Sequence, residues 1–297
     1  MTPPKNASLL AFSRLGAKWR KEALGLFAFT VFFAAGSAWA NGVEAAWDLM
    51  RLGRWDEAEA RLHAAAKQDG EEACEARFAE GMLWQNRRPS PDLARAVASY
   101  QWILARYPQS QFAPWALLEM ARIPDLDVLS PRLEEAIPLY RRVLNEYPGS
   151  DAAQEAALFL ADALFAAQGR DGAQEAVHLL ESWKTAHPNP SYVAAGELLL
   201  GKLYRYPLRD YRKSVEHLGA ALNGGLRSSS ERLVACWTMA TLAERELKDR
   251  ELAVASYSRL LGEFPHHRTA FMAKERLRAL GAPVPTLEDR DLESLSK

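Results

Sequence analysis

The sequence predicts an all-α protein, a right-handed α-solenoid of about six helix pairs that ends in a capping helix. Three observations predict this fold. A set of helical residues recurs at a near-constant period, most copies end at a helix-stopping residue, and a small residue recurs near the centre of the preceding helix. Single-domain enzymes have no reason to show such a period, so we interpret every other feature within it.

The period is measured from a small residue early in the second helix of each pair. These anchors follow one another at a near-constant interval of about 40 residues. They are Ala58, Ala96, Ala136, Ala176, Ser214 and Ala253. In the second copy Tyr100, Ile103 and Leu104 continue one helical face, and Pro108 stops the helix.

Small residues also recur in the first helix of the later pairs. They keep the same interval as the anchors and are Gly81, Ala121, Ala161, Gly201 and Ala240. A residue without bulk at this position lets the second helix pack closely against the first. We therefore attribute this recurring position to packing, not to chemistry.

The array of helix pairs begins at residue 41, and its first three pairs follow from there. Helices are expected over residues 41–52 and about 54–67, and then over about 71–85, followed by a helix that begins near Pro91. In the third pair Pro124 should shorten the first helix and lead into a longer loop. Pro138 falls within the second helix of that pair and should kink it.

The fourth pair is expected as a helix over 151–167, a turn over 169–172 and a second helix that ends near His187. In the fifth pair, Tyr206-Pro207 stops the first helix and Gly224-Gly225 stops the second.

The sixth pair has a cap at Ser228 and a second helix that starts at Asp249 and ends at Phe264. A last helix over 270–280 should cover the end of the array. Residues 282–297 contain prolines and mixed charge, and we predict a disordered tail there.

The first forty residues have a different composition. Basic residues precede an uncharged run over 23–35, and the small residues Ser37, Ala38 and Ala40 follow it. We expect a signal peptide that is cleaved after Ala40, which gives a periplasmic or secreted protein. The alternative is an inner-membrane anchor, because the segment 23–40 reaches the lower limit of a membrane span, about 18 residues. No cysteine follows this segment to accept a lipid.

Charge and cysteine content exclude some classes of partner. Removal of residues 1–40 leaves 32 basic and 37 acidic side chains, a net charge of about −5. This balance argues against non-specific binding of nucleic acid and against a polybasic membrane surface. Cys74 and Cys236 lie four repeats apart, so we expect no disulfide between them and interpret both as small buried hydrophobic residues.

The residues now described resemble a known family. Ala96, Tyr100 and Pro108, together with Gly81, are similar to the signature positions of the tetratricopeptide repeat, and copies continue in phase over residues 41–281. The period here is longer than that family's usual unit of about 34 residues. The motifs at residues 107–110 and 147–150 resemble those of outer-membrane assembly lipoproteins and of the coordinator of the Tol-Pal system. The resemblance implies an exported scaffold that binds partners on a concave surface lined by the first helices.

No residue pattern typical of catalysis occurs. There is no nucleophile elbow, glycine-rich phosphate loop, HExxH or CxxC spacing, and His266-His267 has no metal-ligand partner nearby in sequence. The other histidines lie on different predicted helices, and no sequence pattern joins them in one site. We therefore expect no enzyme activity, no metal and no cofactor.

The aromatic residues divide into two groups. Trp102, Trp183 and Trp237 have helical spacings that suit the core. Trp84 and Trp115 are less clearly inward and are candidates for the groove.

The groove residues follow from helix geometry. The residue after each small residue, and the one a turn later, should point into the groove. The candidates are Met82, Gln85, Arg122, Asp162, Phe165, Lys202, Arg205, Thr241 and Glu244. We expect the three basic residues among them to meet carboxylates of a protein or extended peptide. The alternative is a solvated face of mixed charge.

Three functions remain open at this point. The first is a non-catalytic protein-interaction scaffold of the bacterial cell envelope. The second is an accessory subunit that binds a cell-wall polymer, peptidoglycan or polysaccharide, through groove aromatics that stack on its sugars. The third is a membrane-anchored assembly factor, if the chain is not cleaved after Ala40.

Overall fold

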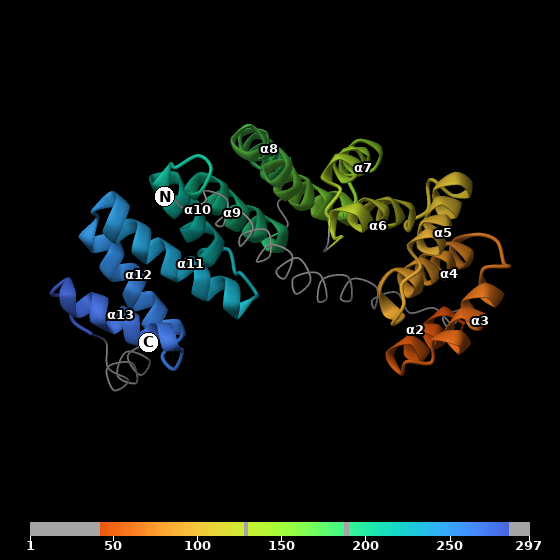
Figure 1. Cartoon of the computed structure of the whole chain (residues 1–297), viewed down its shortest axis with the longest axis horizontal. Helices are drawn as coiled ribbons and strands as arrows, with labels where there is room; N and C mark the ends of the chain where they lie inside the picture. The colour runs from red at the N-terminus through yellow and green to blue at the C-terminus, as the bar shows by residue number, and fades with distance from the viewer. Residues whose placement is uncertain (1–41, 128–129, 187–189, 285–297) are drawn as a thin grey trace, which may run out of the picture. The chain divides into compact units, whose positions relative to one another are not determined.

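A computed structural model describes residues 42–127, 130–186 and 190–284 (Figure 1). Over these residues the protein is helical, without strands, and each helix packs against its neighbours in sequence. The helices are α2 (Val43–Arg51), α3 (Trp55–Ala65), α4 (Glu71–Met82), α5 (Leu93–Arg106), α6 (Ala113–Asp125), α7 (Leu133–Glu146), α8 (Asp151–Ala186), α9 (Pro190–Arg205), α10 (Tyr211–Asn223), α11 (Ser229–Leu242), α12 (Arg250–Glu263) and α13 (Arg268–Ala279).

Three irregularities complete the description. Two short π-helical segments, η1 (Leu83–Arg87) and η2 (Ala243–Leu247), continue α4 and α11. Gly169 breaks α8 with φ 62° and ψ −124°, so α8 contains both helices of the fourth pair. Successive helices form the six expected pairs, and α13 follows them. The all-α class is therefore confirmed.

The chain divides into two compact units, Met1–Ala167 and Gln168–Lys297, which we call the first and second unit and describe separately. The predicted array over residues 41–281 spans both. The predicted signal peptide and most of the predicted tail lie outside the described residues. No helix within the described ranges is long and apolar enough to cross a membrane.

The turn inside five of the pairs is closed by one recurring hydrogen bond. The N–H of the residue that precedes the second helix donates to a carbonyl near the end of the first helix, three residues after the small residue. The N···O distance is 2.9 Å from Asp92 to Trp84, from Arg132 to Pro124, from Asp210 to Tyr204 and from Asp249 to Ala243. Arg54 and Leu49 repeat this bond at 2.9 Å, which identifies Ala46 as the small residue of the first pair.

The connections between pairs also repeat. Tyr107, Tyr147 and Phe264 end their helices with φ from −134° to −133° and ψ from 50° to 59°, because each precedes a proline that disfavours the helical conformation. Their carbonyls accept from the N–H three residues later at 3.0, 3.0 and 3.2 Å. Glycine replaces proline after α10, as predicted, and Gly225 has φ 83°.

Close packing explains the small residues. A Cβ atom on Gly81 would lie 2.3 Å from Tyr100 Cε1, and one on Gly201 would lie 2.7 Å from Leu218 Cγ. The six anchors of the second helices are all fully buried: Ala58, Ala96, Ala136, Ala176, Ser214 and Ala253. Both recurring positions are therefore packing positions, as the sequence predicts.

Some predicted boundaries change. Pro124 lies next to the end of α6, which confirms the shortened helix. Pro138 lies inside α7, which continues to Glu146. The turn expected over residues 169–172 is reduced to the break at Gly169, because helix resumes directly after it.

Candidate functional site

Two candidates of the first unit, Gln85 and Arg122, belong to a polar network that joins the first helices of the second and third pairs. Gln85 Nε2 donates to Glu119 Oε2 at 2.8 Å, and Gln85 Oε1 accepts from the Tyr100 hydroxyl at 2.6 Å. Arg122 forms an ion pair with Glu119, whose exposed fraction is 2%. The network therefore fixes Gln85 and Arg122 in position from within the chain.

The charge of Arg122 is compensated internally. Burial disfavours the charged guanidinium, but Glu119 and Glu155 outweigh this effect and raise the pKa of Arg122. The guanidinium carbon lies 5.4 Å from the centre of the Phe159 ring. A partner carboxylate at Arg122 would have to compete with Glu119, so binding there stays a prediction.

Tyrosine hydroxyls of the second helices form hydrogen bonds to one recurring position of the first helices. Tyr100 donates to Gln85, Tyr140 to Asp125 at 2.8 Å and Tyr257 to Glu244 at 2.8 Å. Each acceptor lies four residues after the small residue of its pair. This position thus faces the second helix of its own pair, where it satisfies a buried hydroxyl.

The three pairs without this tyrosine also lack a carboxylate or amide acceptor. Leu62, Leu180 and Leu218 replace the tyrosine, and the partner positions are Met50, Phe165 and Arg205. The sequence analysis did not predict that the tyrosine and its acceptor occur together, and it omitted Asp125. A comparison of the tyrosine position and the acceptor position across all copies would have revealed that they change together.

Candidates of the second unit form bonds between and within helices. Arg205 Nη1 donates to Thr238 Oγ1 at 3.2 Å, which links α9 to α11. Thr241 donates to carbonyls of its own helix, at 2.9 Å to Trp237 and 3.0 Å to Thr238. Glu244 also forms an ion pair with Arg276 of α13.

The remaining candidates differ in exposure. Met82 is buried, Asp162 and Phe165 are half-buried, and Lys202 is exposed. The structure thus brings together Gln85 and Arg122 through Glu119, and it places Lys202 and Arg205 on α9.

Trp84 is buried, contrary to its interpretation as a groove aromatic. Its ring lies between the guanidinium carbons of Arg88 and Arg95, at 4.2 and 4.0 Å from the ring centre. Glu59 pairs with both arginines, at 2.7 and 3.2 Å. Trp84 therefore belongs to the packing between the first and second pairs. Trp115 is half-buried.

A second polar cluster, which the sequence did not predict, joins α8, α9 and α10 in the second unit. Glu197 accepts from His217 Nδ1 at 2.6 Å and from Lys184 Nζ at 3.3 Å, and Lys184 also pairs with Glu181 at 2.7 Å. Tyr204 stacks on His217 with ring centres 5.2 Å apart. His217 is thus coupled to charged neighbours.

Opposing effects act on Glu197. Burial disfavours its charged form, but the bonds from His217 and Lys184 outweigh burial and lower its pKa. The carboxylate is therefore charged at neutral pH and contributes to the contact between these helices.

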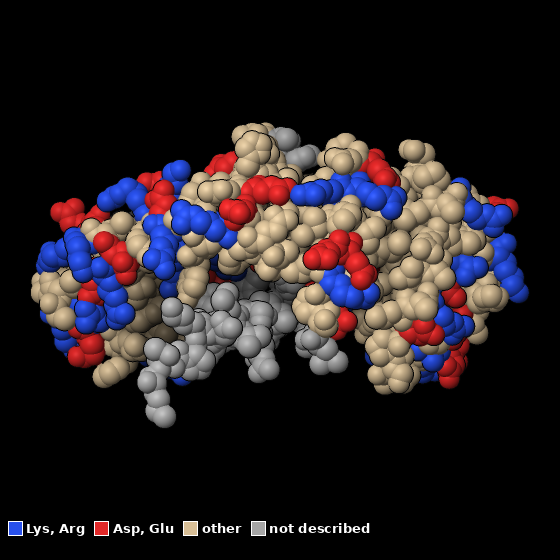
Figure 2. Space-filling view, turned by 45° about the horizontal axis from the view of Figure 1, so that its top comes forward, with Lys and Arg blue, Asp and Glu red and all other residues tan. Residues whose placement is uncertain are grey.

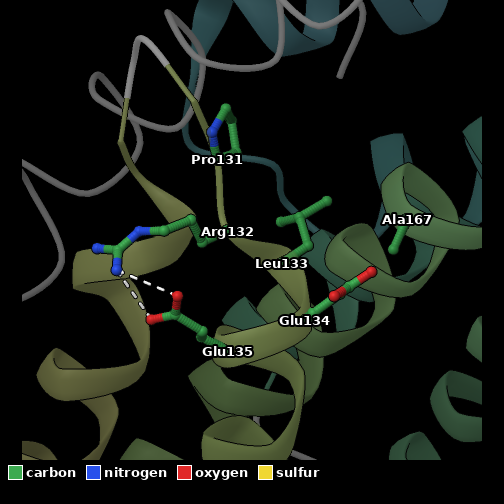
Figure 3. A pocket seen from close by; sticks show the side chains of 6 residues that line it. All are labelled: Pro131, Arg132, Leu133, Glu134, Glu135 and Ala167. Carbon is green, nitrogen blue, oxygen red and sulfur yellow. Dashed lines mark hydrogen bonds and ion pairs between the residues drawn. The ribbon is translucent and has the colours of Figure 1, made fainter.

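A shallow cavity of about 370 Å³ lies beside the start of α7 (Figure 3). Its lining consists of Pro131, Arg132, Leu133, Glu134, Glu135 and Ala167. Arg132 Nη1 pairs with Glu135 at 2.9 Å, so these two charges neutralise each other. None of the predicted site residues lines this cavity.

The remaining residues of chemical interest are the possible metal ligands and the two cysteine thiols. Among the described residues, no group of three or more His, Cys, Asp and Glu side chains is arranged to hold a metal ion. Cys74 and Cys236 are free and buried, as predicted, and burial raises the pKa of Cys236 to about 11.

The chain matches no protein-family model and no curated protein. The functional proposal therefore rests on the residues of this chain.

Proposed function

We propose that this protein is a non-catalytic protein-interaction scaffold of the bacterial cell envelope. A partner protein or an extended peptide binds along the first helices of the pairs. The observation that carries this proposal is the recurring 2.9 Å turn bond, which sets the first helices of five pairs in the same register to their second helices. Equivalent side chains of the first helices therefore have the same orientation within their pairs, which suits a ligand that contacts several pairs of one unit.

Polar bonds between neighbouring pairs support the proposal. Gln85 bonds to Glu119 in the next pair, and Arg205 bonds to Thr238 in the next pair. Side chains held in this way lose little conformational freedom when a ligand arrives. Such preorganisation suits binding.

The tetratricopeptide resemblance and the N-terminal segment support the location. We propose export with cleavage after Ala40, and retention of residues 23–40 as an inner-membrane anchor is the alternative. Amino-terminal sequencing of the exported protein tests this, with Asn41 as the expected first residue. A mature chain that still carries residues 24–33 contradicts cleavage.

Affinity capture from envelope extracts tests the function. Lys202→Gln/Arg205→Gln is expected to lose the partners that the native chain captures. Arg61→Gln/Lys67→Gln is the matched control, because it removes the same charge from exposed positions at the second helix of the first pair. Equal capture by the native chain and the Lys202/Arg205 variant contradicts the assigned face.

Arg122 needs a different variant. Arg122→Ala leaves the buried Glu119 carboxylate without its ion-pair partner, which costs about 3–5 kcal/mol of folding stability. Glu119→Gln/Arg122→Gln removes both charges and avoids that cost.

Sedimentation of the native chain with isolated cell-wall material, in the absence of protein capture, would favour the polymer-binding alternative.

A further inference from the structure

The turn between α9 and α10 concentrates positive charge. Residues 202–213 contain five basic side chains and one acidic side chain, whereas the whole chain has a net charge of −1. The acidic residue, Asp210, caps α10 by accepting from the Lys213 N–H at 3.1 Å. Its carboxylate is thus engaged with backbone. Figure 2 shows Lys and Arg side chains gathered over the second unit, with Asp and Glu side chains between them.

Two arginines of this turn are exposed and have no counter-charge. Among the described residues, Arg209 and Arg212 form neither an ion pair nor a side-chain hydrogen bond, and Glu216, one helical turn from Arg212, does not pair with it. Some other arginines of the second unit do pair with carboxylates, among them Arg232, Arg259, Arg276 and Arg278. Arg259, for example, contacts Glu263 at 2.9 Å. The charges of Arg209 and Arg212 are therefore available to a ligand.

The backbone at Arg209 does not require an arginine. Arg209 has φ 57°, a left-handed conformation that is unfavourable for most residues with a Cβ atom. It immediately precedes the residue that caps the second helix. Gly53 occupies the same position in the first pair with φ 74°, and Lys248 occupies it in the sixth with φ 55°. Glycine thus satisfies the turn, and the Arg209 side chain adds charge, not geometry.

Aromatic rings lie beside the positive groups. The Tyr206 side chain is 51% exposed, and the Arg205 guanidinium carbon lies 6.0 Å from the centre of its ring. Lys213 Nζ lies 5.0 Å from the centre of the Tyr204 ring, whose stacking partner is His217. The turn therefore offers a half-exposed aromatic surface next to fixed cations.

We propose that this basic turn binds an acidic segment of a partner protein and that an apolar side chain of the segment packs on Tyr206. The basic turn consists of Lys202, Arg205, Tyr206, Arg209, Arg212 and Lys213. This inference rests on the proposed function, because Lys202 and Arg205 belong to the predicted binding face. It extends that face around the end of α9 and names the chemistry of the ligand.

The narrowness of the positive area favours a peptide over a membrane. α10 packs against η2. From the end of η2 to the start of α12, basic and acidic residues alternate, so the charge there is balanced: Arg245, Glu246, Lys248, Asp249, Arg250 and Glu251. Guanidinium groups bind carboxylates through paired hydrogen bonds, which suits aspartate and glutamate side chains. A lipid surface needs a broader basic area.

Fluorescence anisotropy with the full chain tests the basic turn. The probe is a labelled peptide of glutamates around one tyrosine. The native chain is expected to bind it, with weaker binding when the ionic strength is raised from about 0.01 M to about 0.15 M. Arg209→Gly/Arg212→Gln is expected to bind at least about tenfold more weakly, because two charged hydrogen-bond donors are lost.

Lys248→Gly is the matched control. It matches Arg209→Gly, because Lys248 occupies the same turn position, has the same left-handed conformation and carries one positive charge, but in a turn of balanced charge. It should bind the peptide as the native chain does. Both glycine substitutions are compatible with the fold, and equal or higher melting temperatures check this.

Three results overturn the proposal. These are equal peptide affinity of the Arg209/Arg212 variant and the native chain, an equal loss in Lys248→Gly, and native binding to phosphatidylglycerol vesicles without binding to the peptide. Partner capture separates this proposal from the scaffold function. If the Arg209/Arg212 variant captures the native partners in full, the scaffold function is kept and the binding role of the basic turn is overturned. If the native chain captures nothing while the peptide result holds, the scaffold is overturned.

Discussion

Single small residues determine how closely the two helices of a pair approach. Gly81 and Gly201 leave space that Tyr100 and Leu218 fill. Such positions are predictable from the sequence because the same size constraint recurs at each period. The hydrogen-bond partners of the tyrosines were not predicted, because the acceptor changes from Gln85 to Asp125 to Glu244 while its position stays the same.

Gly81→Ala is expected to destabilise the protein by about 1–3 kcal/mol, because the added methyl group overlaps the rigid Tyr100 ring, 2.3 Å away. Urea unfolding measures this. Gly262→Ala is the control, since Gly262 lies in α12 with open space around its Cβ position. It should stabilise by about 0.5–1 kcal/mol. Similar changes in both variants would contradict the packing role.

Tyr140→Phe is expected to cost about 1 kcal/mol, because the buried Asp125 carboxylate loses the hydroxyl that donates to it at 2.8 Å. Tyr147→Phe serves as the comparison, because no hydrogen bond of its hydroxyl is seen among the described residues, and its unfolding free energy should change by less than about 0.5 kcal/mol. A Tyr140→Phe variant as stable as the native chain would argue against the bond.

At the scale of helices, capping was predictable and coupling between helices was not. Asp249 and Ser228 cap α12 and α11, as predicted. The π-helical segments were not predicted, whereas the break at Gly169 falls within the turn expected over residues 169–172. His217 appeared isolated because Glu197 and Lys184 lie on other helices, far from it in the sequence.

Glu197 makes the contact of α8, α9 and α10 sensitive to acid. Its pKa is lower in the folded chain than in the unfolded chain, so the folded state binds fewer protons in the acid range. The stabilisation is complete at neutral pH and is lost as the pH falls from about 5 through the lowered pKa. Melting temperatures of the native chain should therefore fall more steeply than those of Glu197→Gln over this range. Parallel curves would exclude the effect.

At the scale of the whole molecule, the period predicted the helix pairs because many weak signals repeat in phase. The binding face stays a prediction. Lys202 is exposed and Arg205 lies beside it on α9, but Arg122, Gln85 and Glu244 are bonded to other side chains of the chain. Such bonds join separate pairs, so a single helix pattern cannot reveal them.

Photo-crosslinking tests the central claim, that partners bind along the first helices, most directly. A photoreactive amino acid replaces Lys202 on α9 in one variant and His178, which is exposed on the second helix of the fourth pair, in another. A partner captured by the native chain should crosslink from position 202 and not from position 178. Crosslinking from position 178 alone, or equally from both positions, would contradict the claim.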